Sequence, residues 1–346
     1  MTYTSITIYS LFMASGSKVA VYSAIIGNSI VMVAKFIAFF FTGSSSMLSE
    51  GIHSFADVSN QCLLALGIQK SQRKADVRHP YGYVRERYIW ALISAVGIFF
   101  LGCGVTVYHG VHGLFDPHEI EDYTLAFVVL AFAFIVEGAT LLIALKAVSN
   151  EAKKKQQSFI SYFKGGTDPT GVAVILEDGA AVLGVLIAAL GLGFSYYTHN
   201  PFWDSVATIL IGLLLGGVAT FITYRTRGLL IGQAIPEVSR KKILEILKAE
   251  PVIDQIYDIK TAIIGAQDLL FKAEVEFDGE KIAQKYMSHH DFDKLIQNLA
   301  TEGDLRQFLL EYGDHVIETL GDEIDRIEKQ IQHEVPDLKY IDLEVN

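Results

Sequence analysis

Six long apolar segments alternate with short polar connections along the first two thirds of the chain. Each is about 20 residues long, which is the length a helix needs to cross the hydrocarbon core of a bilayer. The segments lie near residues 19–41, 47–69, 89–112, 123–146, 172–194 and 205–224. The pattern therefore predicts a polytopic α-helical membrane protein with six transmembrane helices.

A different pattern begins after residue 226. An amphipathic helix is predicted over about 237–249, and two alternating runs over about 254–264 and 269–277 predict strands. A helical stretch follows over 281–334, with breaks near 301–303 and Gly313, and a short strand is predicted over 338–345. This order is that of an α+β ferredoxin-like domain. We predict a transmembrane domain at 1–226 and a ferredoxin-like domain at 227–346, with a helical insertion at about 281–312.

The acidic charge is confined to the second of these regions. The chain is 51% hydrophobic with a mean hydropathy of +0.34. Residues 226–346 contain 25 acidic and 14 basic residues, whereas the first 225 contain 14 of each. An acidic soluble domain argues against nucleic acid as a partner. The acid-rich helices within 281–334 fit either a solvated face or a partner-binding site.

Basic residues set the orientation of the helices. They gather in the connections after the second and fourth apolar segments, and the other three connections contain no Lys or Arg. The positive-inside rule then places both termini in the cytoplasm. The first residues resemble neither an Arg-rich transit peptide nor a cleavable signal. We therefore expect a multi-pass protein of a cell inner (plasma) membrane.

The second apolar segment carries ionisable residues in its interior. Glu50, His53 and Asp57 are spaced i, i+3 and i+7, so they share one helix face. Ionisable side chains inside a bilayer are costly and usually functional. An imidazole and a carboxylate one turn apart form a pair that Zn²⁺ and neighbouring transition metals bind. We predict a metal site on this face.

The fifth apolar segment supplies a second set of candidate ligands, Glu177 and Asp178. Adjacent helical residues point about 100° apart, so only one of them can face the first set. Asp178 is the favoured ligand. Glu177 could be a proton carrier, a ligand in another state, or a helix-packing residue.

Two further groups of polar residues are candidates for binding or packing. Asp76 and His79, in the basic connection after the second segment, could form a secondary metal site with Tyr83 or anchor the loop. Lys35 and Glu137, within the first and fourth segments, are expected to pair; the alternative is that Lys35 extends outward to the interface while Glu137 joins a polar pathway.

The chain resembles the cation diffusion facilitator family, the solute carrier 30 zinc transporters. The features that carry the resemblance are the six spans, SSSMLSEGIHSFAD in the second, RHPYGY after it, Asp178 in the fifth and the ferredoxin-like end. Within the family it looks closest to the branch of the ninth mammalian zinc transporter. That likeness is carried by LED-x-AAVLG, NPFWDS, FKAEVEFDG and the helical insertion.

The resemblance implies a tetrahedral transport site with two ligands on each of two helices. His53 and Asp57 match one pair, and Asp178 matches one position of the other. The remaining position falls on Val174, which cannot bind a metal, so water, Glu50 or Glu177 would complete the shell. Asp76 and His79 match a loop site of the family. The family's C-terminal histidine positions hold other residues here, namely Tyr257, Glu274 and Asp342.

Residues and resemblance together predict a secondary active transporter and not an enzyme. The predicted activity is efflux of a divalent cation, foremost Zn²⁺, in exchange for protons by alternating access, with Mn²⁺, Co²⁺, Fe²⁺ and Ni²⁺ as further substrates. The predicted partners are the ion, protons, the lipid bilayer and a second copy of the chain in a homodimer. The alternative is a non-transporting membrane metal sensor or scaffold that acts through the acidic C-terminal domain.

Overall fold

The computed structural model describes residues 16–42, 45–116, 123–155, 157–288, 296–297 and 299–346. Within the helices, the side chains of 38, 39, 41, 42 and 45–53 are outside that description. The chain divides into two compact units, Met1–Ile231 and Gly232–Asn346. The predicted boundary between residues 226 and 227 falls within the last helix of the first unit.

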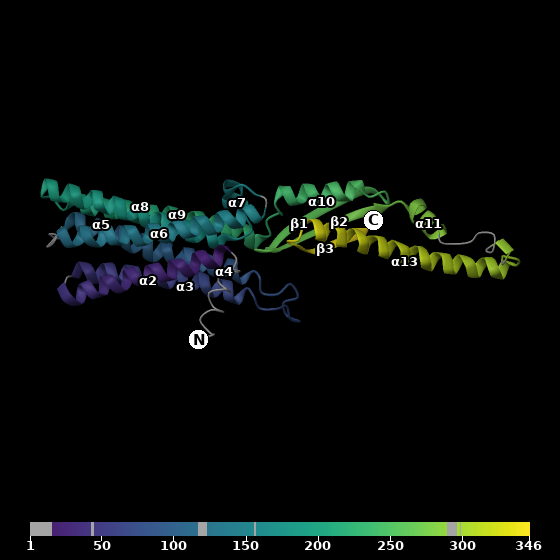
Figure 1. Cartoon of the computed structure of the whole chain (residues 1–346), viewed down its shortest axis with the longest axis horizontal. Coiled ribbons are helices and arrows are strands. Elements are labelled where there is room, and N and C mark those ends of the chain that lie inside the picture. Colours follow the sequence, from purple (N-terminus) through teal and green to yellow (C-terminus); the bar gives the residue numbers. More distant parts are fainter. Residues whose placement is uncertain (1–15, 43–44, 117–122, 156, 289–295, 298) are drawn as a thin grey trace, which may run out of the picture. The chain divides into compact units, whose positions relative to one another are not determined.

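The regular elements that the structure describes in the first unit are all helices, joined by short connections (Figure 1). Its elements are α2 (Gly16–Thr42), α3 (Ser45–Lys70), α4 (Glu86–Gly97), η1 (Ile98–Val105), α5 (Thr106–Phe115), α6 (Tyr123–Lys154), α7 (Phe159–Gly165), α8 (Pro169–Thr198) and α9 (Phe202–Ile231). The elements α4, η1 and α5 form one continuous helical segment with a π-helical middle. This unit corresponds to the predicted membrane domain.

Five helical segments among the described residues are long and apolar enough to cross a membrane. They are Gly16–Ile37, Glu86–Phe115, Tyr123–Lys154, Pro169–Thr198 and Phe202–Ile231. The predicted second span is present as α3, a helix of 26 residues, but it is not one of these five. Its sequence includes Glu50, His53, Asp57 and Asn60, which lower its hydropathy. The residues that make α3 a candidate site are thus the ones that weaken it as an apolar span.

Small residues bring α9 close to η1 and to the start of α5. A side chain at Gly216 would meet the sulfur of Cys103, and one at Gly212 would meet Val107. Close approach through small residues is a common mode of helix packing in membranes. The contact fixes one wall of the bundle, while α8 packs against α6 and α9.

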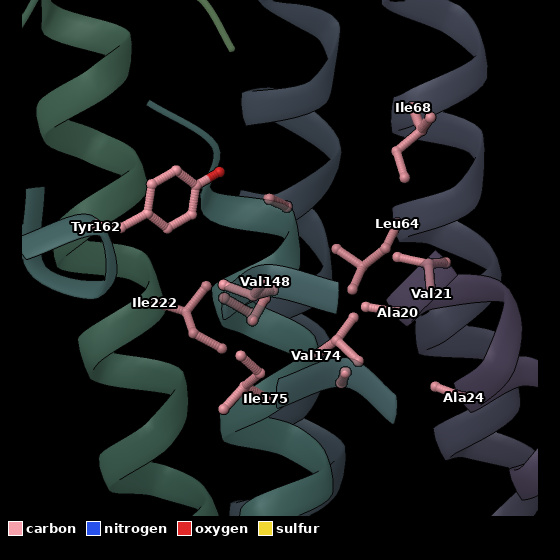
Figure 2. Close-up of a cluster of buried hydrophobic side chains, with 14 of the residues drawn as sticks. Ala20, Val21, Ala24, Leu64, Ile68, Val148, Tyr162, Val174, Ile175 and Ile222 are labelled. Carbon is pink, nitrogen blue, oxygen red and sulfur yellow. The ribbon is translucent and has the colours of Figure 1, made fainter. Parts of the chain in front are cut away.

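An apolar cluster forms the core of the first unit (Figure 2). It draws Ala20, Val21 and Ala24 from α2, Leu64 and Ile68 from α3, and Val174 and Ile175 from α8. The side chains from α2 and α3 recur at helical spacing, so each of these helices turns one apolar stripe inward, whereas Val174 and Ile175 are adjacent on a fully buried stretch of α8. The cluster positions the polar residues that lie beside it on α3 and α8.

The second unit is a three-stranded mixed sheet with helices. It contains α10 (Glu237–Ala249), β1 (Ile253–Gly265), β2 (Asp268–Phe277), α11 (Gly279–Met287), α13 (Glu302–Glu334) and β3 (Leu338–Val345). The strand order is β1-β2-β3, with β1 antiparallel and β3 parallel to β2. The helix at 237–249 and the three strands agree closely with the sequence prediction.

The predicted break at Gly313 is wrong, because α13 runs through it without interruption. A single glycine in a helix costs about 1 kcal/mol relative to alanine, and the rest of the helix outweighs this cost. The predicted break near 301–303 is confirmed, since α13 begins there. Thr301 caps the helix by accepting from the Asp304 amide, and Asp304 reciprocates.

Replacing Thr301 by alanine should therefore loosen the start of α13. The loss of an N-cap of this kind costs about 1 kcal/mol of helix stability. Hydrogen exchange at the first turns of α13 should accelerate by about fivefold, which is the equivalent of that free energy. Thr319→Ala, in the middle of the same helix, is the control and should leave exchange at the helix start unchanged. Equal exchange in the Thr301 variant and the wild type would contradict the capping role.

Candidate metal-transport site

One face of α3 carries polar side chains in its middle and apolar ones at its end. Asp57, Asn60, Gln61 and Leu64 are spaced i, i+3, i+4 and i+7, so they share this face. Gln61 and Leu64 are buried, whereas Asp57 is exposed. The helix thus presents a carboxylate, two amides and then the apolar core along one line.

Asp178 lies on α8 and is buried, with 3% of its surface exposed. Thr140 of α6 lies beside its carboxylate, and Asp57 is near enough to interact with it electrostatically. Its Oδ2 atom has no hydrogen-bond partner among the described residues. A buried, incompletely paired carboxylate is costly, which is the usual mark of a functional group inside a bundle.

Glu177 faces a different set of neighbours from Asp178. Its Oε2 accepts a hydrogen bond of 2.5 Å from the Nε2 of Gln61. Asn60 of α3 and Ser94 of α4 also lie near this carboxylate. The two adjacent acidic residues therefore point to different sides of α8, as the 100° rotation per residue requires.

Val174 is fully buried in the apolar core with Leu64 and Ala20 (Figure 2). It lies one turn before Asp178, where the family resemblance implies a fourth ligand. A valine in this environment offers no donor atom and is held by packing. Any fourth donor to a metal at Asp178 must therefore come from another residue or from water.

Glu50 and His53 are helical residues of α3, but their side chains lie outside the described residues. Among the side chains that the structure does describe, no group of three or more His, Cys, Asp or Glu residues is arranged to hold a metal ion. The described part of the site thus consists of Asp57 and Asp178, with Glu177 beside them. Lys35 is buried on α2 and Glu137 lies on α6, two helices that pack against each other.

Asp76 and His79, the residues of the predicted secondary loop site, lie close together, and Tyr83 also contacts Asp76. The Asp76 Oδ1 lies 3.4 Å from the His79 Nδ1 and accepts the backbone amides of residues 78 and 79. The Tyr83 hydroxyl donates to Asp76 Oδ2 at 2.8 Å, which holds the pKa of the Asp76 carboxyl below its usual value. Arg73 lies over the Tyr83 ring. Through these contacts the Asp76 carboxylate anchors the loop.

A buried ion pair joins the start of α4 to the start of α8, and the sequence reasoning did not identify it. Arg87 Nη1 donates to Asp168 Oδ2 at 2.9 Å, and Asp168 Oδ1 accepts the Thr170 amide. Asp168 is the N-cap of α8 and precedes Pro169, a pairing that could have marked the start of the helix. Nothing in the sequence pattern indicated Arg87 as its partner.

A bundle of apolar helices with a buried carboxylate on α8 and a second carboxylate near it on α3 is typical of a polytopic membrane transport protein. The family described as "Cation efflux transmembrane domain" matches residues 21–231. This chain belongs to that family. The match runs from Val21 in α2 to Ile231 at the end of α9 and includes both Asp57 and Asp178.

Similar proteins from other organisms are also named as metal-cation transporters or metal tolerance proteins. The human "Proton-coupled zinc antiporter SLC30A9, mitochondrial" is 42% identical over 339 residues, which is 97% of this chain and 60% of the human protein. The Arabidopsis thaliana "Metal tolerance protein C4" is 40% identical over 95% of this chain and 74% of its own length. The Shewanella oneidensis "Cation-efflux pump FieF" is 24% identical over 78% of this chain and 84% of its own length. The chain thus spans about 60% of the human relative.

The predicted inner (plasma) membrane location is wrong by this comparison. The animal relatives carry the word mitochondrial in their names, and none of the three names given above points to a plasma membrane. The prediction rested on the first residues of this chain. Because the chain covers only 60% of the human protein, those residues do not report on targeting. The multi-pass membrane character of the first unit is unaffected.

Proposed function

We propose that this protein is a secondary active transporter that exchanges a divalent metal cation, foremost Zn²⁺, for protons across a membrane. The observation that carries the proposal is the placement of Asp57 and Asp178 near each other on two helices of an otherwise apolar bundle. Deprotonated carboxylates attract both metal ions and protons, so one site can bind either in turn. The names of the human and plant relatives point in the same direction.

The proposed metal ligands are His53, Asp57 and Asp178. Glu50 or water completes the shell, because Val174 is buried and apolar and Glu177 faces a different side of α8 from Asp178. A mixed imidazole and carboxylate set suits Zn²⁺, with Mn²⁺, Co²⁺, Fe²⁺ and Ni²⁺ as further substrates. A neutral imidazole is a common metal ligand that can also take up a proton, which suits exchange of metal for protons.

The transport cycle that we propose is alternating access. The site binds metal while open to the side that carries the basic connections. Helix movement then exposes it to the opposite side, where protons displace the ion. The exposure of Asp57 beside the buried Asp178 is compatible with one ligand helix facing an aqueous route.

The proposed architecture has six spans, with α3 as the sixth. A helix of 26 residues is long enough to cross, and neighbouring helices can shield its polar face. We propose that the second unit is a ferredoxin-like domain with a helical insertion, and that two copies of the chain form a homodimer. The mixed sheet and the α10-β1-β2-α11-α13-β3 order support the ferredoxin-like assignment of the second unit.

A second candidate function is a membrane metal sensor or scaffold that does not transport. The observation that favours it is Val174, which leaves the site one ligand short. The four carboxylates on α3 and α8, which are costly inside a bilayer, would then be vestigial, and this argues against the alternative.

Metal flux into sealed proteoliposomes distinguishes the two functions. The full chain should move Zn²⁺ when a pH gradient is imposed, and collapse of the gradient with a protonophore should stop net accumulation. Protein-free liposomes are the control. If the wild type moves none of Zn²⁺, Mn²⁺ and Co²⁺ under gradients of either direction, the transporter proposal fails and the sensor is favoured.

A further inference from the structure

The two helices that carry the proposed ligands meet mainly through side chains. The backbone of α3 packs closely against α2 and α4, whereas that of α8 packs against α6 and α9. The spacing between Asp57 and Asp178 is therefore not fixed by a close backbone contact between their own helices. Two shared neighbours, α2 and α4, pack against both helices, and side-chain contacts between α3 and α8 link them directly.

A hydrogen bond from Gln61 to Glu177 links these two helices directly. It spans 2.5 Å and joins residues 116 positions apart in the sequence. Gln61 lies one turn after Asp57, and Glu177 is the neighbour of Asp178. The bond therefore lies one turn or less along each helix from the two proposed ligands.

The hydrogen bond between Gln61 and Glu177 is shielded from water. Gln61 is 1% exposed, so its amide has little competition from water. A hydrogen bond in a poorly solvated interior is stronger than one exposed to water. The Oε1 atoms of Gln61 and Glu177 and the Oδ1 of Asn60 have no hydrogen-bond partners among the described residues. Apolar residues would fill this space at lower cost, which indicates a role beyond packing.

We propose that Gln61 and Glu177 are a positioning pair that holds α3 and α8 in register and thereby sets which divalent cation fits the transport site. This inference rests on the proposed function. Zn²⁺ takes four ligands at about 2.0–2.2 Å, so it needs closely spaced donors. Mn²⁺ suits oxygen donors in six-coordinate geometry and tolerates a more open site. Loss of the bond should therefore penalise Zn²⁺ more than Mn²⁺.

The test compares KM and kcat for Zn²⁺ and Mn²⁺ in proteoliposomes. Gln61→Leu removes the donor and should raise the KM for Zn²⁺ by about tenfold, the lower range for loss of an outer-shell partner. The KM for Mn²⁺ should change by less than about twofold, because its looser shell depends less on register. Gln69→Leu, an exposed glutamine on the same helix, is the matched control and should leave both values unchanged.

The exchanged pair Gln61→Glu with Glu177→Gln gives the decisive comparison. It keeps one amide and one carboxylate at the same place, so the preference for Zn²⁺ over Mn²⁺ should return to the wild-type value. It also guards against misfolding of Gln61→Leu, because it preserves volume and the hydrogen bond. If the Zn²⁺ to Mn²⁺ preference is unchanged in Gln61→Leu, or is not restored by the exchange, the inference is wrong while the proposed function stands. Absence of metal flux in the wild type would instead overturn both.

Discussion

Replacing Asp57 or Asp178 by alanine is expected to reduce Zn²⁺ flux by at least about 100-fold. Loss of an outer-shell partner alone costs 10- to 100-fold, and a direct ligand should cost no less. The two carboxylates are near each other on α3 and α8, and Asp178 is buried. Neither alanine variant can supply the missing donor, since the neighbouring Val174 is apolar. Initial rates of zinc uptake into proteoliposomes, at matched protein content, measure the effect.

Asp116→Ala is the matched control for this pair of variants. Asp116 follows the end of α5 and is exposed, so its loss should leave flux within about twofold of the wild type. If either Asp57→Ala or Asp178→Ala retains wild-type flux, that residue is not a ligand. Survival of flux in both variants would remove the assigned site altogether.

Replacing Arg87 by leucine is expected to destabilise the first unit by about 3–5 kcal/mol. Breaking a buried ion pair at one partner leaves the other charge buried without compensation. Here the charge left behind is Asp168, the N-cap of α8, and both side chains are about nine-tenths buried. Denaturant or thermal unfolding in detergent micelles should show the loss. A change below about 1 kcal/mol would contradict this account of the pair.

Two variants isolate the cause of this destabilisation. Arg85→Leu removes an exposed arginine two residues earlier and should change stability by less than about 0.5 kcal/mol. Adding Asp168→Asn to Arg87→Leu should recover most of the loss, because asparagine still caps the helix but buries no charge.

The pH dependence of the Arg87 effect follows from Asp168. Burial raises the pKa of its carboxyl, but Arg87 and hydrogen bonds from Ser17 and Thr170 outweigh it, so the pKa lies below its usual value. A depressed pKa stabilises the folded state above the unfolded pKa, and that stability is lost as the pH falls through the folded pKa. The stability that the Asp168 carboxylate contributes to the wild type should therefore be full at neutral pH and shrink below about pH 4 in unfolding measurements.

Local pattern was enough to predict most of the elements. The helix at 237–249 and the three strands follow from hydrophobic periods of 3.6 and 2, which depend only on neighbouring residues. The polar face of α3 and the acidic residues of α8 were visible because charge is rare in apolar segments. The continuous α13 was not predicted, because the length of the helix outweighs the local cost of Gly313.

The contacts between distant residues could not be read from the sequence. Gln61 and Glu177 are 116 residues apart, and Arg87 and Asp168 are 81 apart. Periodicity says which way a side chain faces on its own helix but not which helix it meets. Hydropathy alone also does not identify α3 as a span. Its polar residues predict a site, but they lower its mean hydropathy below that of the five apolar helices.

X-ray absorption at the zinc edge of the full chain in lipid nanodiscs tests the central claim most directly. Our account predicts a shell of nitrogen and oxygen donors near 2.0–2.2 Å, including imidazole. The His53→Ala variant should lose the imidazole contribution, and Asp178→Ala should lose bound zinc. A shell that contains sulfur near 2.3 Å, or one that neither substitution changes, would contradict the assignment of the metal to this site.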